Sequence, residues 1–221
     1  MVMATTAYTA AVTSIASVTL EVADLESARR FYSAFGVDTH LSLRASEEHS
    51  TGFRGFTLAL TVSGPATVDG FVGAAVDAGA TVLKPAAKSL WGYSGVLRAP
   101  DGTIWKIATS SKKDNGPDSR RIDEVVLLLG VEDVKATKQF YTGRGLTVAK
   151  SFGGKYVEFA AGQSSPVKLA LYKRRALAKE VGVPVEGAGS HRIVLGSTGD
   201  TFTDLDGFAW EAAEPAAPTA S

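Results

Sequence analysis

Residues 17–36, SVTLEVADLESARRFYSAFG, decide the fold, because residues 126–145, VLLLGVEDVKATKQFYTGRG, repeat their pattern without a gap. Each stretch begins with alternating apolar residues, which is typical of a strand with one buried face. An aspartate follows, Asp24 or Asp133, and it predicts the N-cap of a helix that carries a Phe-Tyr pair and ends near a glycine. The sequence therefore predicts two copies of a strand–helix unit.

A second pair of motifs closes each half of the chain. Residues 100–107 read PDGTIWKI and residues 205–212 read LDGFAWEA, so that each Asp-Gly turn precedes a tryptophan by two residues. The residue after the tryptophan is Lys106 in one copy and Glu211 in the other. Between the two motifs, the first half has the patterns of a strand, a helix and further antiparallel strands. Each half thus predicts an α+β arrangement, with both tryptophans in the core.

Composition restricts the classes of function. The chain has 221 residues, of which 45% are hydrophobic, and its 23 basic residues balance its 23 acidic ones. This balance, without a long run of one charge, excludes the basic patch that nucleic-acid binders use. The chain has no cysteine, which excludes disulfides and thiolate chemistry, and no stretch approaches the roughly 18 apolar residues of a membrane span. We expect a cytoplasmic protein with a small-molecule partner, no nucleic acid and no membrane.

The polar segment 111–121 has the composition of a linker between two domains. We expect the domains at 15–110 and 122–213, with flexible tails at 1–14 and 214–221. The first module is short after its helix, and the last one lacks a helix, because only GDTF separates HRIVLGS from TDLDGFAWEAA. The second half is therefore the more degenerate one.

Several strings together resemble a known family: TLEVADLESARRFYSAFG, GFRGFTLALTV, AGATVLKP, WGYSGVLRAPDG and IWKIA. They are similar to the glyoxalase, bleomycin-resistance and extradiol-dioxygenase group, the vicinal oxygen chelate superfamily. The resemblance covers most of 15–110 and returns over 122–175 and 189–213. It implies an α+β fold of tandem, trimmed glyoxalase-like domains built from βαβββ modules, whose curved sheets form clefts.

The resemblance also implies a divalent metal, held by a side chain early in a module's first strand and another late in its last strand. In this chain the early positions fall on Ser17 and Val126, and the late ones on Lys106 and Glu211. An ammonium group at Lys106 would repel a metal ion. His191 and Glu211 remain as candidate ligands, fewer than the three or four that a metal site normally needs. We therefore expect no metal or other cofactor.

Without a metal, the cleft of the first domain is the expected ligand-binding site. The polar face of its first strand would supply residues to that cleft, Lys106 would pair with Glu21 across it, and an aromatic pair would lie at its mouth. The predicted ligand-binding residues are Ser17, Thr19, Glu21, Trp91, Tyr93 and Lys106.

Three functions remain open. The leading prediction is a glyoxalase-like, metal-independent protein that binds a small, largely apolar or aromatic molecule, as drug-resistance members of the family do. The second is a lyase or isomerase of the vicinal oxygen chelate type that uses Lys106 and Glu21, or Glu211, for proton transfer. The third is a non-catalytic interaction module, in which the degenerate half serves as the surface of a homodimer.

Overall fold

The computed structural model describes residues 14–114, 116–162 and 165–212. The first half contains two modules, of which the second has the full βαβββ order. The first module consists of β1 (Ile15–Val22), α1 (Leu25–Phe35), the 3₁₀ turn η1 (Asp38–His40), β2 (Ser42–Ala45) and β3 (Ser50–Gly52). The second consists of β4 (Phe56–Val62), α2 (Pro65–Asp77), β5 (Thr81–Ser89), β6 (Gly92–Arg98) and β7 (Ile104–Thr109).

The second half has one full module and one reduced module. The third module consists of β8 (Ile122–Val131), α3 (Val134–Gly143), β9 (Val148–Phe152), β10 (Tyr156–Phe159) and β11 (Lys168–Lys173). A connection containing α4 (Arg174–Val181) and β12 (Gly187–Gly189) leads to the last module, β13 (Ile193–Ser197), β14 (Phe202–Thr203) and β15 (Ala209–Ala212). The predicted α+β class and the absence of a helix in the last module, between β13 and β15, are confirmed. Apart from Ser14, the expected tails at 1–14 and 214–221 lie outside the described residues.

The two strand–helix units form as predicted. The Asp24 side chain accepts a hydrogen bond from the Ser27 amide, and Asp133 accepts hydrogen bonds from the first-turn amides of α3. These contacts satisfy amides that have no partner within the helix. Gly36 ends α1 in the left-handed conformation, with φ of 86°, which a residue without Cβ adopts at little cost.

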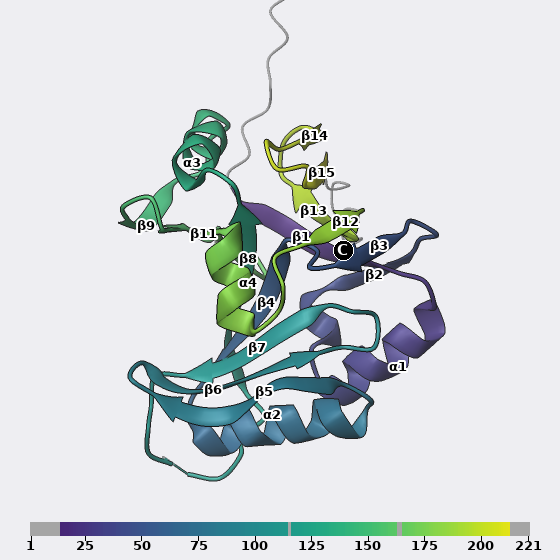
Figure 1. Cartoon of the computed structure of the whole chain (residues 1–221), viewed down its shortest axis with the longest axis vertical. Coiled ribbons are helices and arrows are strands. Elements are labelled where there is room, and N and C mark those ends of the chain that lie inside the picture. Colours follow the sequence, from purple (N-terminus) through teal and green to yellow (C-terminus); the bar gives the residue numbers. More distant parts are fainter. Residues whose placement is uncertain (1–13, 115, 163–164, 213–221) are drawn as a thin grey trace, which may run out of the picture.

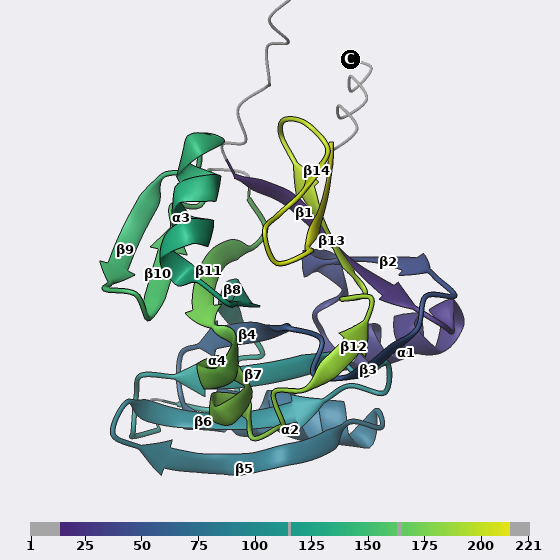
Figure 2. The same ribbon diagram turned by 45° about the horizontal axis from the view of Figure 1, so that its top comes forward.

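Strand pairing joins the modules across the two halves. The large sheet has eight strands in the order β5-β6-β7-β4-β8-β11-β10-β9, and the small sheet has five in the order β14-β15-β13-β1-β2. The second module therefore pairs with the third, through antiparallel β4 and β8, and the first pairs with the last, through antiparallel β1 and β13. Figures 1 and 2 show the yellow C-terminal strands beside the purple N-terminal strand.

The expectation that the two modules of one half share a cleft is wrong. The central strands β4 and β8 each bury one apolar face and meet along almost their whole length, which joins neighbouring modules of different halves. Domain limits at 15–110 and 122–213 thus describe the repeat along the chain, whereas the sheets group the four modules differently. The linker expected at 111–121 runs between β7 and β8.

The main core lies between the sheets and the helices α1, α2 and α3, and it fully buries Trp105 and Trp210 as predicted. A second, smaller core lies on the opposite face of the large sheet, under α4. There Leu177, Ala178 and Val181 pack among side chains that include Val96 and Ile104. Figure 1 shows α2 and α4 on different sides of β6 and β7. None of the helices in the described part of the chain has the length and hydropathy of a membrane span.

Candidate functional site: the small-sheet cleft

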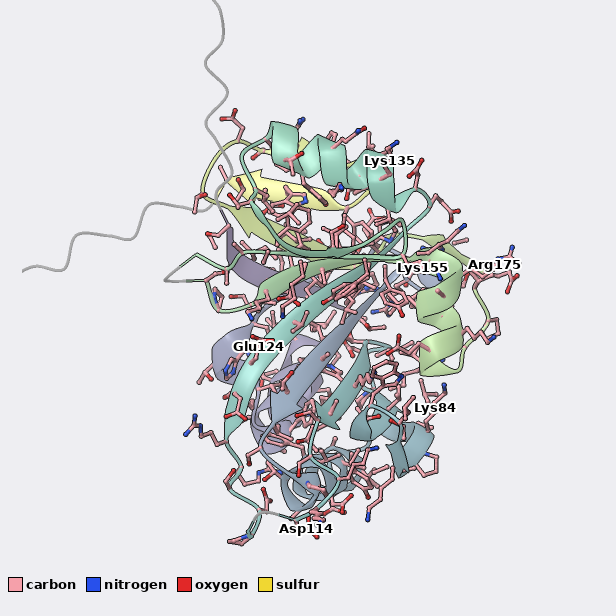
Figure 3. All side chains as sticks on the ribbon, turned by 90° about the vertical axis from the view of Figure 1, so that its left-hand side faces the viewer. Lys84, Asp114, Glu124, Lys135, Lys155 and Arg175 are labelled. Atoms are coloured by element: carbon pink, nitrogen blue, oxygen red, sulfur yellow. The ribbon has the colours of Figure 1, made fainter. Side chains whose placement is uncertain are left out.

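Lys106 lies under α4 and away from Glu21. Its Nζ atom is 2.5 Å from Glu180 Oε1 on α4, whereas Glu21 pairs with Arg44 on β2. The predicted Lys106–Glu21 ion pair is therefore wrong, because Lys106 belongs to the large sheet and Glu21 to the small one. The Lys84 side chain also holds the C-terminal end of α4, where it donates to the carbonyls of Lys179 and Glu180. Figure 3 shows Lys84 below the end of α4 and Arg175 pointing away from the sheet.

The predicted aromatic pair lies at the turn between β5 and β6 and at the start of β6, in the large sheet, whereas β1 belongs to the small sheet. Trp91 is 85% exposed. The Tyr93 hydroxyl donates to Asp69 Oδ1 on α2 at 2.9 Å, and partial burial raises the pKa of Tyr93. The ring thus points to the helix-covered face of the sheet. The structure does not bring these two aromatic residues together with Ser17, Thr19 and Glu21.

A cleft of about 370 Å³ opens on the face of the small sheet that its core does not use, and we call it the small-sheet cleft. Its apolar part is formed by Val194 and Ala209, and its polar part by Ser190, His191 and three charged side chains, which are Glu21, Arg44 and Glu211. Of the six ligand-binding residues predicted from the sequence, Glu21 is the one that lines this cleft in the described part of the chain. Ser17 and Thr19 lie on the same face of β1 as Glu21. They alternate with Val18 and Leu20, which are buried on the opposite face.

Arg44 joins the two carboxylates of the cleft. Its Nη2 atom donates to Glu21 Oε1 at 2.7 Å, and its Nη1 atom lies 3.0 Å from both carboxylate oxygens of Glu211. These hydrogen bonds, first that to Glu21 and then that to Glu211, raise the pKa of the Arg44 guanidinium. The group therefore stays charged and is held at two edges. The sequence analysis missed Arg44 because it lies in a short strand, SLRA, with little periodicity.

The Arg44–Glu211 pair bridges the concave face of the small sheet. Arg44 is on β2 and Glu211 on β15, and two strands, β1 and β13, separate them in the sheet. Three strand spacings amount to roughly 14 Å on a flat sheet. The two side chains can meet only because the sheet curves strongly, so the ion pair spans the hollow of the cleft.

His191 forms one wall of the cleft just before β13. Its ring stacks on Phe208 with centroids 4.0 Å apart, and its nitrogens face two backbone carbonyl oxygens. Nδ1 lies 2.5 Å from the Arg54 carbonyl oxygen and Nε2 lies 3.0 Å from that of Asp206. Both ring nitrogens thus lie within hydrogen-bond distance of backbone carbonyl oxygens, and a metal ion at either nitrogen would take the place of one of these contacts.

These residues do not fit the divalent metal that the resemblance implies. The described residues contain no group of three or more His, Asp or Glu side chains arranged to hold a metal ion. The two carboxylates that do converge, Glu21 and Glu211, already share a cation, the guanidinium of Arg44. A divalent ion bound by these two carboxylates would be repelled by the Arg44 guanidinium, which is hydrogen-bonded to both of them.

The early and late positions named by the resemblance do converge, but across the halves. In the small sheet, Ser17 pairs with Gly196, which in turn pairs with Glu211. In the large sheet, Lys106 pairs with Ala59, which in turn pairs with Val126. Each sheet thus has one row in which the late position of one module reaches the early position of its partner. Neither row carries two metal-binding side chains.

A second hollow, of about 310 Å³, lies at the start of α1. Three of its polar groups maintain the fold: Asp24 caps α1, Asp101 accepts from the Tyr32 hydroxyl, and Arg192 donates to the backbone carbonyls of Glu21, Ser46 and Glu48. Arg192 is 8% exposed and has φ of 55°. Through its three hydrogen bonds, its guanidinium ties the segment after β2 to β1. The small-sheet cleft, in which an exposed ion pair lies above apolar side chains, is the better candidate site.

Comparison with known proteins places the chain by its fold. No protein-family model matches it, and no curated protein matches it. A mutant of glyoxalase I from Zea mays is similar in structure, with a TM-score of 0.57 and 13% identity over 89% of this chain and 92% of that one. A putative dioxygenase from Bacillus subtilis is also similar, with a TM-score of 0.52 and 10% identity over 85% of this chain and 71% of that one. With its repeated βαβββ modules and two curved sheets, the chain has the fold of the vicinal oxygen chelate superfamily.

Proposed function

We propose that this protein binds a small organic molecule in the small-sheet cleft without a metal ion. The observation that carries the proposal is the cleft itself, a hollow of about 370 Å³ with apolar residues at its base and a charged group bridging it. Ligand sites commonly combine an apolar lining with a few polar groups that fix orientation. Charged side chains form a large part of this lining, so the ligand carries a polar group as well as an apolar part.

The proton-transfer alternative has less support. Lys106 is 29% exposed and is paired with Glu180 on α4, so it would have to leave this ion pair to meet a substrate. Glu21 and Glu211 both face the cleft, but Arg44 holds both as hydrogen-bonded carboxylates. A general base at either position would have to act from within its ion pair with Arg44.

The interaction-module alternative draws on the large sheet. Its concave face is filled by α4, so that face has the character of a packed core instead of a binding cleft. The homodimer expected from the sequence stays a prediction, and sedimentation velocity of the full chain tests it.

A fragment screen with two matched variants tests the proposed function. The library contains one-ring and two-ring compounds, each present as a carboxylate, an amide and an amine, and ligand-observed NMR detects binding. Ala209→Trp fills the base of the cleft, and Ala149→Trp places the same side chain on exposed β9. We expect fragments that bind the wild type and Ala149→Trp but not Ala209→Trp. Circular dichroism checks that Ala209→Trp is folded. If the folded variant still binds every fragment that the wild type binds, the proposal is wrong.

A further inference from the structure

We infer that the small-sheet cleft selects ligands with a carboxylate group, and that Glu211 occupies the carboxylate position at Arg44 until such a ligand arrives. This inference rests on the proposed function and names the ligand class for the same cleft. It follows from the unequal surroundings of the two carboxylates that share Arg44.

The two ion pairs of Arg44 differ in burial. Glu21 is 14% exposed and lies on β1, directly beside Arg44 in the register of the sheet. Glu211 is 49% exposed and reaches Arg44 from β15, across the hollow. A mostly buried carboxylate depends on its cationic partner, because removing that partner leaves an uncompensated charge in a poorly solvated place. An exposed ion pair contributes little, because water can solvate both groups.

This difference decides which group leaves when a ligand enters. A cationic ligand that takes the position of Arg44 has to displace it from both carboxylates, including the buried Glu21. An anionic ligand has only to displace Glu211, whose carboxylate turns into solvent. Arg44 stays in place, held by Glu21, and presents its Nη1 edge to the newcomer. The second route costs less free energy, so the cleft favours an anion.

The contacts of Arg44 also indicate which anion. Nη1 lies 3.0 Å from both oxygens of the Glu211 carboxylate, so the position already accommodates a planar group with two oxygens. Beside it, Ser190 lines the cleft, and its hydroxyl accepts from the Arg192 amide while keeping its own proton to donate. Val194 and Ala209 offer apolar contact to the rest of the ligand. A small carboxylate with an apolar body matches these groups.

The matched fragments provide the test, with benzoate, benzamide and benzylamine as the reference set. We expect benzoate to bind more tightly than benzamide, and benzylamine to bind most weakly. Glu211→Gln removes the competing charge and should strengthen benzoate binding about two- to five-fold, which corresponds to about 0.4 to 1 kcal/mol. The same variant should change benzamide binding less than benzoate binding, because benzamide has no charge.

A second glutamate variant controls for net charge. Glu47 is exposed and follows β2, and Glu47→Gln changes the charge of the protein equally without touching Arg44. We expect Glu47→Gln to change benzoate binding less than Glu211→Gln does, in isothermal titrations at 0.15 M salt.

The outcomes separate the two proposals. Benzylamine binding more tightly than benzoate, or equal effects of Glu47→Gln and Glu211→Gln, would contradict the carboxylate inference while the cleft stays a binding site. If Ala209→Trp abolishes no fragment binding, the proposed function fails, and the ligand class fails with it.

Discussion

The hydroxyl of Tyr141 donates a hydrogen bond to Asp204 Oδ2 at 2.5 Å, inside the core beneath α3. The equivalent tyrosine of the first half, Tyr32, donates to Asp101 Oδ2 at 3.0 Å. In both cases the tyrosine of a module's helix bonds an aspartate in a turn of the next module in the same half. The sheets link modules across the halves, and these two hydrogen bonds link modules within each half.

Tyr141→Phe should lower the free energy of unfolding by about 2 kcal/mol, because it removes a hydrogen bond to a buried carboxylate. It also removes the acceptor of Trp210 Nε1, which lies 3.2 Å from the hydroxyl. Tyr32→Phe should cost less, because Asp101 Oδ2 keeps a hydrogen bond from the Thr103 hydroxyl, whereas the remaining amide donors of Asp204 bond its other oxygen, Oδ1. Urea unfolding followed by tryptophan fluorescence measures both. Equal losses in the two variants would contradict this comparison.

Asp204 should make the fold less stable as the pH rises from the acid range. Burial raises the pKa of its carboxyl above the ordinary value of 3.8, although hydrogen bonds from Tyr141 and from the Phe208 and Asp206 amides act in the opposite direction. Because the pKa is raised in the folded state, the contribution of Asp204 to the free energy of unfolding is complete below pH 3.8. This contribution is lost as the pH rises through the folded-state pKa. Asp204→Asn should remove this part of the profile.

Asp24 provides a control of opposite sign. Hydrogen bonds from the Ser27 amide and hydroxyl lower the pKa of Asp24, so its contribution is present above pH 3.8 and lost as the pH falls through the folded-state pKa. We expect Asp24→Asn and Asp204→Asn to change the pH dependence of the free energy of unfolding in opposite directions. Denaturant unfolding between about pH 3 and pH 7 measures this. Changes of the same sign would show that burial does not disfavour the charged form of Asp204.

Leu177→Ala should loosen α4 from the large sheet. Leu177 is 1% exposed in the smaller core, and truncation of such a leucine costs about 2 to 5 kcal/mol. Arg175→Ala, on the outer side of the same helix, should cost less than about 0.5 kcal/mol. Hydrogen exchange at the amides of residues 174–181 reports the change directly. Unaltered protection in Leu177→Ala would show that other contacts hold the helix.

Wild-type protein should bind no divalent metal stoichiometrically in the small-sheet cleft, because Arg44 supplies the cation between Glu21 and Glu211. Elemental analysis and anaerobic titrations with Ni²⁺, Zn²⁺, Mn²⁺ and Fe²⁺ measure this. Stoichiometric binding that Glu211→Gln or His191→Ala abolishes would overturn the metal-free interpretation and make a metalloenzyme the leading candidate.

The strands and helices of the repeat could be predicted because their signals are local. Alternating residues, Asp caps and the terminating Gly36 depend on neighbours a few positions away. Helix α4 also has a local signal, since Leu177, Ala178 and Val181 share one face and Gly182 follows. Its packing position explains why Lys106 was misassigned.

The choice of partner strand could not be predicted in the same way. The first strand of each module carries a similar apolar face, so nothing in the residues of β1 distinguishes β13 from a strand of its own half. That choice depends on the whole chain, because it is made by contacts between residues about 170 positions apart. The residues around Arg44 depend on it, so the candidate site could be found only in part.

The pairing of β1 with β13 also sets the order in which a growing chain can complete its parts. The large sheet uses residues up to Lys173, so all of its strands have been synthesised while the last module is still missing. During that interval β1 has no antiparallel neighbour, and Glu21 and Arg44 have no Glu211 above them. Domains generally fold as their residues emerge during synthesis. The cleft is therefore the last part of the molecule to form, and a chain that ends before β13 would keep the large sheet and leave the edge of β1 open to other strands.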